Sequence, residues 1–184
     1  MNTDRLYQHG TLAMLVPGLF AGTQKIEELL QHGNTGIGTL TGLDGELVII
    51  DSKVYQVNAQ GAVREVGLEE EVPFANVHYQ ADKSVGKLQG LDLSGFQKTV
   101  LERLQTANLF AAVRVEGRFT QMHTRAVLPQ QPPYPTLTET ASGQKEFNAE
   151  NIKGTLIGYY SPDLYAGAVS PGFHLHFLDA DHHM

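Results

Sequence analysis

Two histidines near the C-terminal end of the sequence have the residue type and the spacing to bind a metal ion. His174 and His176 stand two positions apart in the apolar run 173–178. Side chains two positions apart in a β-strand point to the same face, so both imidazoles would face one way. A catalytic zinc ion typically takes three protein ligands and keeps one position open. The pair therefore predicts part of a zinc site, with the third ligand from elsewhere; the alternative is that both histidines only line a polar sheet face.

Three further residues could do chemistry beside such a site. Glu46 follows the Asp44-Gly45 turn at the start of an apolar strand, where a carboxylate can face a cleft or simply be a solvated charge at the strand end. Arg125 lies within a strand among short or apolar neighbours, which is typical of an arginine in a structural salt bridge or one that binds an anionic ligand. Thr39 lies in a strand near a glycine-rich turn and is not informative alone.

The composition points to a globular protein that acts on a small molecule. The 184 residues carry a net charge of −7 and are 41% hydrophobic, which is enough for a core. The basic residues are scattered, which argues against nucleic acid and against an anionic membrane surface as partners. There is no cysteine, so a metal would be held by His, Asp or Glu. Without a signal peptide or a run of membrane-spanning length, we expect a soluble, cytoplasmic protein.

Local patterns predict the strands that would position these residues. Apolar stretches separated by turns predict an antiparallel meander of four strands over residues 37–66 and a fifth strand over 73–79. Residues 109–127 are predicted to form a long hairpin with its turn at Glu116-Gly117. Three more strands are expected, over residues 152–160, 164–169 and 173–178.

Two helices are predicted from their ends. The first has Thr23 as its N-cap and Gly33 just past its C-terminus. The second opens at Ser94, and Gln97 would complete a capping box.

A proline-rich segment divides the chain. Residues 128–137 hold four of the eight prolines, and proline cannot continue a central strand. This predicts an N-terminal domain over 1–135 and a second domain over 136–184. Three strands without a covering helix make a poor domain, so the second domain looks incomplete and should expose a sheet edge and apolar surface. We therefore expect self-association.

The order of motifs resembles the α-acetolactate decarboxylase family. The resemblance runs in order from about Leu6 to Asp181. Each motif is modest alone, and together they are specific. The motifs are Gly36-Ile-Gly-Thr-Leu, Leu43-Asp-Gly-Glu-Leu, Tyr55-Gln-Val, Val113-Arg-Val-Glu-Gly-Arg-Phe, Thr124-Arg-Ala-Val, Lys153-Gly-Thr-Leu-Ile-Gly and Gly172-Phe-His-Leu-His-Phe-Leu-Asp.

This resemblance implies a function and a set of site residues. It implies a zinc ion bound by three histidines, of which His174 and His176 match the first two. It also implies a catalytic glutamate at Glu46, an arginine at Arg125 and a supporting threonine at Thr39. Members of the family are usually dimers, and they convert 2-acetolactate to acetoin and carbon dioxide. The implied fold is α+β, with two similar α/β-layer domains of mixed, largely antiparallel sheets, the second of them incomplete in this chain.

The sequence departs from the family pattern at its C-terminal end. The family's third zinc ligand and a second catalytic glutamate follow the His-x-His, and this sequence stops at Met184 before either. His182 and His183 do not match the position of the third ligand. We therefore expect a shortened chain that binds zinc weakly and that is inactive if the missing groups are required. The alternative is a non-catalytic remnant of the fold that serves as an oligomerisation or small-ligand-binding module.

Overall fold

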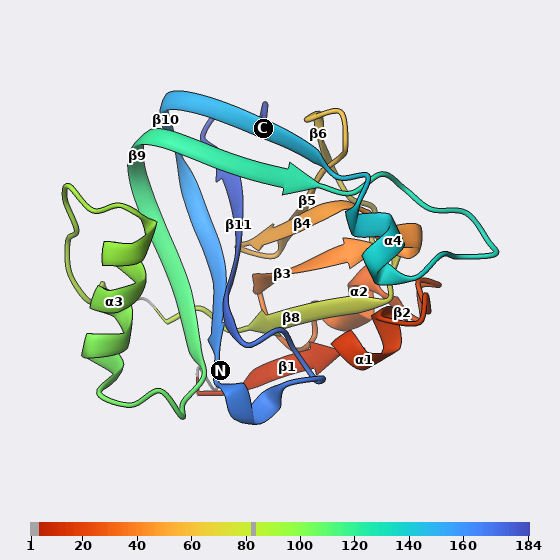
Figure 1. The fold of residues 1–184 in the computed structure, drawn as a ribbon, viewed down its shortest axis with the longest axis horizontal. Helices are drawn as coiled ribbons and strands as arrows, with labels where there is room; N and C mark the ends of the chain where they lie inside the picture. The colour runs from red at the N-terminus through yellow and green to blue at the C-terminus, as the bar shows by residue number, and fades with distance from the viewer. Residues whose placement is uncertain (1–3, 82–83) are drawn as a thin grey trace.

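The computed structural model describes residues 4–81 and 84–184, and its architecture is α+β with two main antiparallel sheets (Figure 1). This confirms the predicted fold class. The elements are β1 (Leu6–His9), α1 (Leu12–Leu15), β2 (Gln24–Lys25), α2 (Ile26–Leu29), β3 (Thr35–Leu40), the 3₁₀ turn η1 (Thr41–Leu43), β4 (Asp44–Ile50), β5 (Lys53–Val57), β6 (Val63–Glu65), β7 (Glu71–Val72), β8 (Phe74–His78), α3 (Leu93–Leu104), β9 (Ala111–Ala126), α4 (Leu137–Ala141), β10 (Lys145–Ser161), the 3₁₀ turn η2 (Asp163–Tyr165) and β11 (Gly172–Asp179).

The larger sheet has six strands in the order β1-β8-β3-β4-β5-β6. The predicted meander forms its β3–β6 part, and the predicted fifth strand is β8. Alternate residues of β4 face opposite sides because strand side chains alternate. Leu47 and Ile49 pack against Ile26 and Leu29 of α2, whereas Val48 faces the other sheet. Both faces of the larger sheet are therefore buried at its centre.

The smaller sheet has the order β11-β10-β9 and covers the second face of the larger one. Its Ile157, Tyr159 and Leu178 pack with Ile37 and Val48 in a core between the two sheets. Figure 1 shows β9 and β10 as a long bent pair whose far ends arch over the β4–β5 region. Phe147 of β10 lies against Gly61, in the turn between β5 and β6. The far ends of β9 and β10 therefore cover one end of the space between the two sheets.

The predicted hairpin over residues 109–127 is wrong. β9 runs without a turn from Ala111 to Ala126, and Gly117 lies opposite Gly154 of β10. The residues Glu116 and Gly117 stay extended because β10, contributed from later in the chain, pairs with the whole length of β9. A local Glu-Gly signal for a turn does not reveal such a distant partner.

Three other local predictions are also wrong in detail. Residues 164–169 form no strand, since η2 and an isolated bridge occupy that stretch. Helix α3 is capped by Asp92, two residues before the predicted Ser94, and the Asp92 side chain accepts from the backbone N–H of Gly95 at 2.7 Å. The Thr23 hydroxyl does not cap α2 but lies 2.8 Å from His9 Nε2.

The proline-rich segment 128–137 connects β9 to α4 and β10, which follows α4. The smaller sheet therefore takes strands from both sides of residue 135. The division into domains 1–135 and 136–184, and the incompleteness of the second, stay predictions. Within the described residues, no helix is long and apolar enough to cross a membrane.

A buried polar pair joins the two sheets. His78 Nδ1 of β8 lies 2.8 Å from the Tyr159 hydroxyl of β10, and both residues are at most 6% exposed. Burial lowers the pKa of the His78 imidazole. A hydrogen bond with Gln80 raises this pKa and the charge of Arg114 lowers it, but burial is the largest effect, so the pKa is lowered overall. Protonation of His78 is therefore unfavourable in the folded chain.

We expect this pair to make the fold acid-sensitive. Below the ordinary histidine pKa of about 6.5, the unfolded chain protonates His78 while the folded chain does not. The free energy of unfolding then falls as the pH drops below that value, by less than about 1.4 kcal/mol per pH unit for one proton. Urea unfolding of His78→Gln between pH 7.5 and 5.5 should show a flatter dependence than the wild type. The exposed His32→Gln is the control, and a slope in His78→Gln equal to the wild type would contradict the assignment.

Candidate active site

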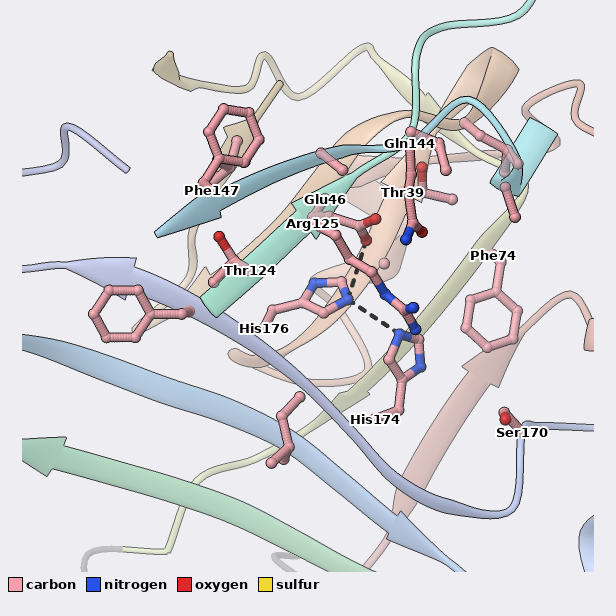
Figure 2. A pocket seen from close by; sticks show the side chains of 18 of the residues that line it. Thr39, Glu46, Phe74, Thr124, Arg125, Gln144, Phe147, Ser170, His174 and His176 are labelled. Atoms are coloured by element: carbon pink, nitrogen blue, oxygen red, sulfur yellow. Dashed lines mark hydrogen bonds and ion pairs between the residues drawn. The ribbon is translucent and has the colours of Figure 1, made fainter. Parts of the chain in front are cut away.

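The structure brings together all five residues singled out in the sequence. Thr39, Glu46, Arg125, His174 and His176 line one pocket of about 590 Å³ between the two sheets, under the arched end of β9 and β10. They come from four strands, β3, β4, β9 and β11. Figure 2 shows the side chains of Glu46, Arg125, His174 and His176 pointing toward one another.

The two histidines converge on one point, as their spacing on a strand requires. Their Nε2 atoms are 3.2 Å apart. His176 is held by a second contact, because its Nδ1 lies 2.8 Å from the carbonyl oxygen of Leu47 in β4. A carbonyl can only accept, so Nδ1 carries the proton and Nε2 presents a lone pair to the pocket.

Burial keeps the imidazoles neutral. His176 is 7% exposed, and burial lowers its pKa to about 4 against the raising effect of the Leu47 carbonyl. Burial also lowers the pKa of His174, with His176 and Arg125 adding to the lowering and Glu46 opposing it. His174 is exposed as a whole residue, and its ring points into the pocket toward His176 (Figure 2). Both rings are therefore neutral at pH 7, the form in which histidine binds a metal ion.

Glu46 adds an acidic group to this point. Its Oε2 lies 3.1 Å from His176 Nε2, and its side chain is 29% exposed toward the pocket. Burial raises the pKa of Glu46, against lowering by His174 and Arg125. Burial disfavours the charged carboxylate, so the site shifts Glu46 toward its protonated form relative to an exposed glutamate. The raised pKa suits Glu46 to a role as a proton donor.

Thr39 lies directly opposite Glu46 across the β3–β4 pair, so both side chains share the pocket face. Its hydroxyl donates to the carbonyl oxygen of Gly45 at 2.8 Å, and the residue is 8% exposed. The hydroxyl is thus engaged with the backbone just before Glu46. The geometry assigns Thr39 a contact with the turn that carries Glu46.

Arg125 has no carboxylate partner within 4 Å among residues 4–81 and 84–184. Its cross-strand neighbour Glu146 pairs instead with His123, at 3.3 Å. Of the two alternatives that the sequence allows, the structural salt bridge is therefore not formed. The guanidinium projects toward His174 and remains free to bind an anion in the pocket (Figure 2).

The histidine pair fits two positions of a zinc coordination sphere. Two nitrogens bound to one tetrahedral zinc at the usual length of about 2.0–2.1 Å lie about 3.3 Å apart, close to the observed separation of the two Nε2 atoms. The Leu47 carbonyl supplies the outer contact that orients a metal-bound histidine. In the part of the chain that the structure describes, no group of three or more His, Asp or Glu side chains could hold a metal ion. His174 and His176 could therefore supply two ligands.

Sequence reasoning missed the pocket residues that come from the arched strands and from the chain end. Gln144, Phe147 and Met184 line the pocket, and no local motif marks them. A prediction that β9 pairs with β10 would have revealed Gln144 and Phe147, because this pairing places residues 144–147 over the site. His182, which was not predicted to belong to the metal site, packs against Tyr55 in a tilted arrangement with ring centroids 4.4 Å apart.

Comparison with known proteins gives a consistent family. The profile described as "Alpha-acetolactate decarboxylase" matches residues 6–184. Enzymes named alpha-acetolactate decarboxylase from Brevibacillus brevis and Methanosarcina mazei are 36% and 37% identical over 96% of this chain. The chain spans 62% of the length of each of these relatives.

Solved structures agree with this result over nearly the whole chain. A crystal structure of a Staphylococcus aureus protein described as similar to alpha-acetolactate decarboxylase has a TM-score of 0.94 and 40% identity. That of alpha-acetolactate decarboxylase from Bacillus subtilis strain 168 has a TM-score of 0.93 and 31% identity. Each match covers 97% of this chain and 77% of the other.

Proposed function

Because the chain belongs to the α-acetolactate decarboxylase family, we propose that it acts in the conversion of 2-acetolactate to acetoin and carbon dioxide. The observation that carries the proposal is the convergence of His174, His176, Glu46 and Arg125 in one pocket. Two neutral imidazoles, a carboxyl group with a raised pKa and a guanidinium that has no carboxylate partner among the described residues suit the decarboxylation of a hydroxy keto acid.

We propose zinc as the cofactor, held in part by His174 and His176. When bound, a zinc ion supplies Lewis-acid stabilisation of the negative charge that develops on the substrate oxygens. The support is the spacing of the two Nε2 atoms, together with the Leu47 carbonyl that fixes the tautomer of His176.

Arg125 and Glu46 have the two remaining roles in the reaction, which are substrate binding and proton delivery. The guanidinium of Arg125 binds the substrate carboxylate and holds it in the pocket until carbon dioxide leaves. Loss of carbon dioxide leaves an enediolate, which needs one proton on carbon to become acetoin. The Glu46 carboxyl, with its raised pKa, delivers that proton from its side of the pocket. Delivery to one face would set the configuration of the product.

We propose that the chain forms a homodimer and that it acts in the cytoplasm. The support is the family resemblance. Apolar side chains exposed beside α3, such as Val85 at 79% and Leu93 at 62%, are also consistent with association of two copies. A sedimentation experiment that gives a monomer at tens of micromolar would exclude the dimer.

Acetoin formation from racemic acetolactate with added zinc tests the function. The His174→Ala protein provides the background of spontaneous decarboxylation. We expect the wild type to form acetoin above that background. Equal rates for the two proteins would reject the enzymatic activity of this chain and would favour a non-catalytic role for the fold.

Substitution of Arg125 tests the carboxylate contact. We expect Arg125→Gln to raise KM by about 10–100-fold, because a hydrogen bond to a charged group contributes about 1.5–3 kcal/mol. Arg118→Gln on the same strand is the matched control, since the Arg118 guanidinium donates to the Asn151 carbonyl and does not line the pocket. Steady-state kinetics measure the effect; the same KM in both variants would remove Arg125 from the substrate site.

A further inference from the structure

The turn that precedes Glu46 has an unusual backbone. Gly42, Leu43 and Gly45 have φ values of +74°, +55° and +72°, in the left-handed region. A leucine rarely adopts this conformation, because its Cβ crowds the backbone. A Cβ at position 45 would lie 2.6 Å from the carbonyl oxygen of Val57. The turn that aims Glu46 therefore needs contacts that hold it in place.

Two side chains hold consecutive carbonyl groups of this turn. Thr39 Oγ1 donates to the oxygen of Gly45 at 2.8 Å, and Gln56 Nε2 donates to the oxygen of Asp44 at 2.7 Å. Gln56 is 2% exposed. A buried hydrogen bond of this kind is costly to remove, because its partner would be left unsatisfied. The last two peptide groups before Glu46 are thus fixed.

The two donors reach the turn from opposite faces of the sheet. Thr39 lies opposite Glu46, on the pocket face. Gln56 lies opposite Leu47, whose side chain packs on the other face against α2. Gln56 is not among the described residues that line the pocket, and it reaches the site through the backbone of β4.

The amide of Gln56 is itself oriented. Arg64 Nε donates to Gln56 Oε1 at 2.5 Å, which leaves the amide nitrogen to face Asp44. The Arg64 guanidinium is in turn held by both oxygens of Glu70, each at 2.7 Å. A chain of hydrogen bonds thus runs from Glu70 to the turn beside Glu46.

We propose that Gln56 is a positioning residue for the Glu46 carboxyl group. From the face of the sheet opposite the pocket, Gln56 donates a hydrogen bond to the Asp44 carbonyl oxygen. This contact keeps Glu46 Oε2 beside His176 Nε2. This inference rests on the proposed function only for its effect on turnover. Its effect on the geometry of the site can be measured without any activity.

Gln56→Glu removes the amide N–H donor of Gln56 and keeps the acceptor oxygen. The glutamate can still accept from Arg64, but it has no N–H for the Asp44 carbonyl. Gln60→Glu introduces the same charge in the exposed turn between β5 and β6, where no side-chain bond of Gln60 is found among the described residues, and is the matched control. If Gln56→Glu does not fold, Gln56→Met gives a similar volume without the donor.

Two measurements decide the proposal. In the zinc-free protein, we expect the ring ¹⁵N signals of His176 to shift in Gln56→Glu and not in Gln60→Glu. In turnover, we expect kcat to fall by about tenfold or more, as for a misplaced catalytic group, while KM changes by less than about twofold because Gln56 contacts no substrate. A folded Gln56→Glu protein with the kcat of Gln60→Glu overturns the proposal. If the wild type forms no acetoin, the proposed function fails, and the His176 signals alone decide on Gln56: a shift supports its positioning role and an unchanged spectrum overturns it.

Discussion

Glu46→Gln is expected to lower kcat for acetoin formation by about 10²–10⁴-fold, the range for loss of a general acid. The glutamine keeps the shape of Glu46 and can still contact His176 Nε2, but it cannot deliver a proton to the enediolate. Substrate binding is assigned to Arg125, so KM should change little. Steady-state kinetics at saturating zinc measure the effect.

Glu65→Gln is the matched control for this substitution. Glu65 lies at an exposed position of the edge strand β6 and does not line the pocket, so its kcat should equal that of the wild type. A kcat for Glu46→Gln within about threefold of the Glu65→Gln value would show that another group supplies the proton, since general acids contribute at least about 10²-fold. Retained zinc binding in Glu46→Gln would separate a proton-transfer role from a metal-binding one.

Removal of His176 is expected to have the largest effect on the metal. We expect His176→Ala to weaken zinc binding by more than about 100-fold, because it removes a ligand rather than an outer contact, whose loss typically costs 10–100-fold. His174→Ala should have a similar effect, since both Nε2 atoms converge on one point. Isothermal titration with zinc at pH 7.5 gives the affinities.

His182→Ala provides the control, because the His182 ring packs against Tyr55. Its zinc affinity should match that of the wild type. A loss of binding in His182→Ala equal to that in His176→Ala would mean that the last residues of the chain enter the metal site. Unchanged binding in His176→Ala would reject the zinc site proposed at the histidine pair.

The sequence by itself determined the features that depend on neighbouring residues along the chain. The two-residue spacing of His174 and His176 placed both imidazoles on one face, because side-chain direction alternates strictly along a strand. The apolar stretches and the turns between them over residues 37–66 predicted the meander, because a tight turn depends on a few neighbouring residues. The motifs around Glu46 and Arg125 indicated the family, which the comparisons confirm. These are local properties, and they survive folding unchanged.

The tertiary structure alone decided what each of these side chains faces. Among the described residues Arg125 has no carboxylate partner, because its cross-strand neighbour Glu146 of β10 pairs with His123, and β10 was not predicted to pair with β9. The tautomer of His176 follows from a carbonyl 129 positions away, that of Leu47. Gln56 reaches the turn before Glu46 from the far face of the sheet. Each contact joins segments that are distant in sequence, and their pairing depends on the whole packed arrangement, so no local pattern of residues encodes it.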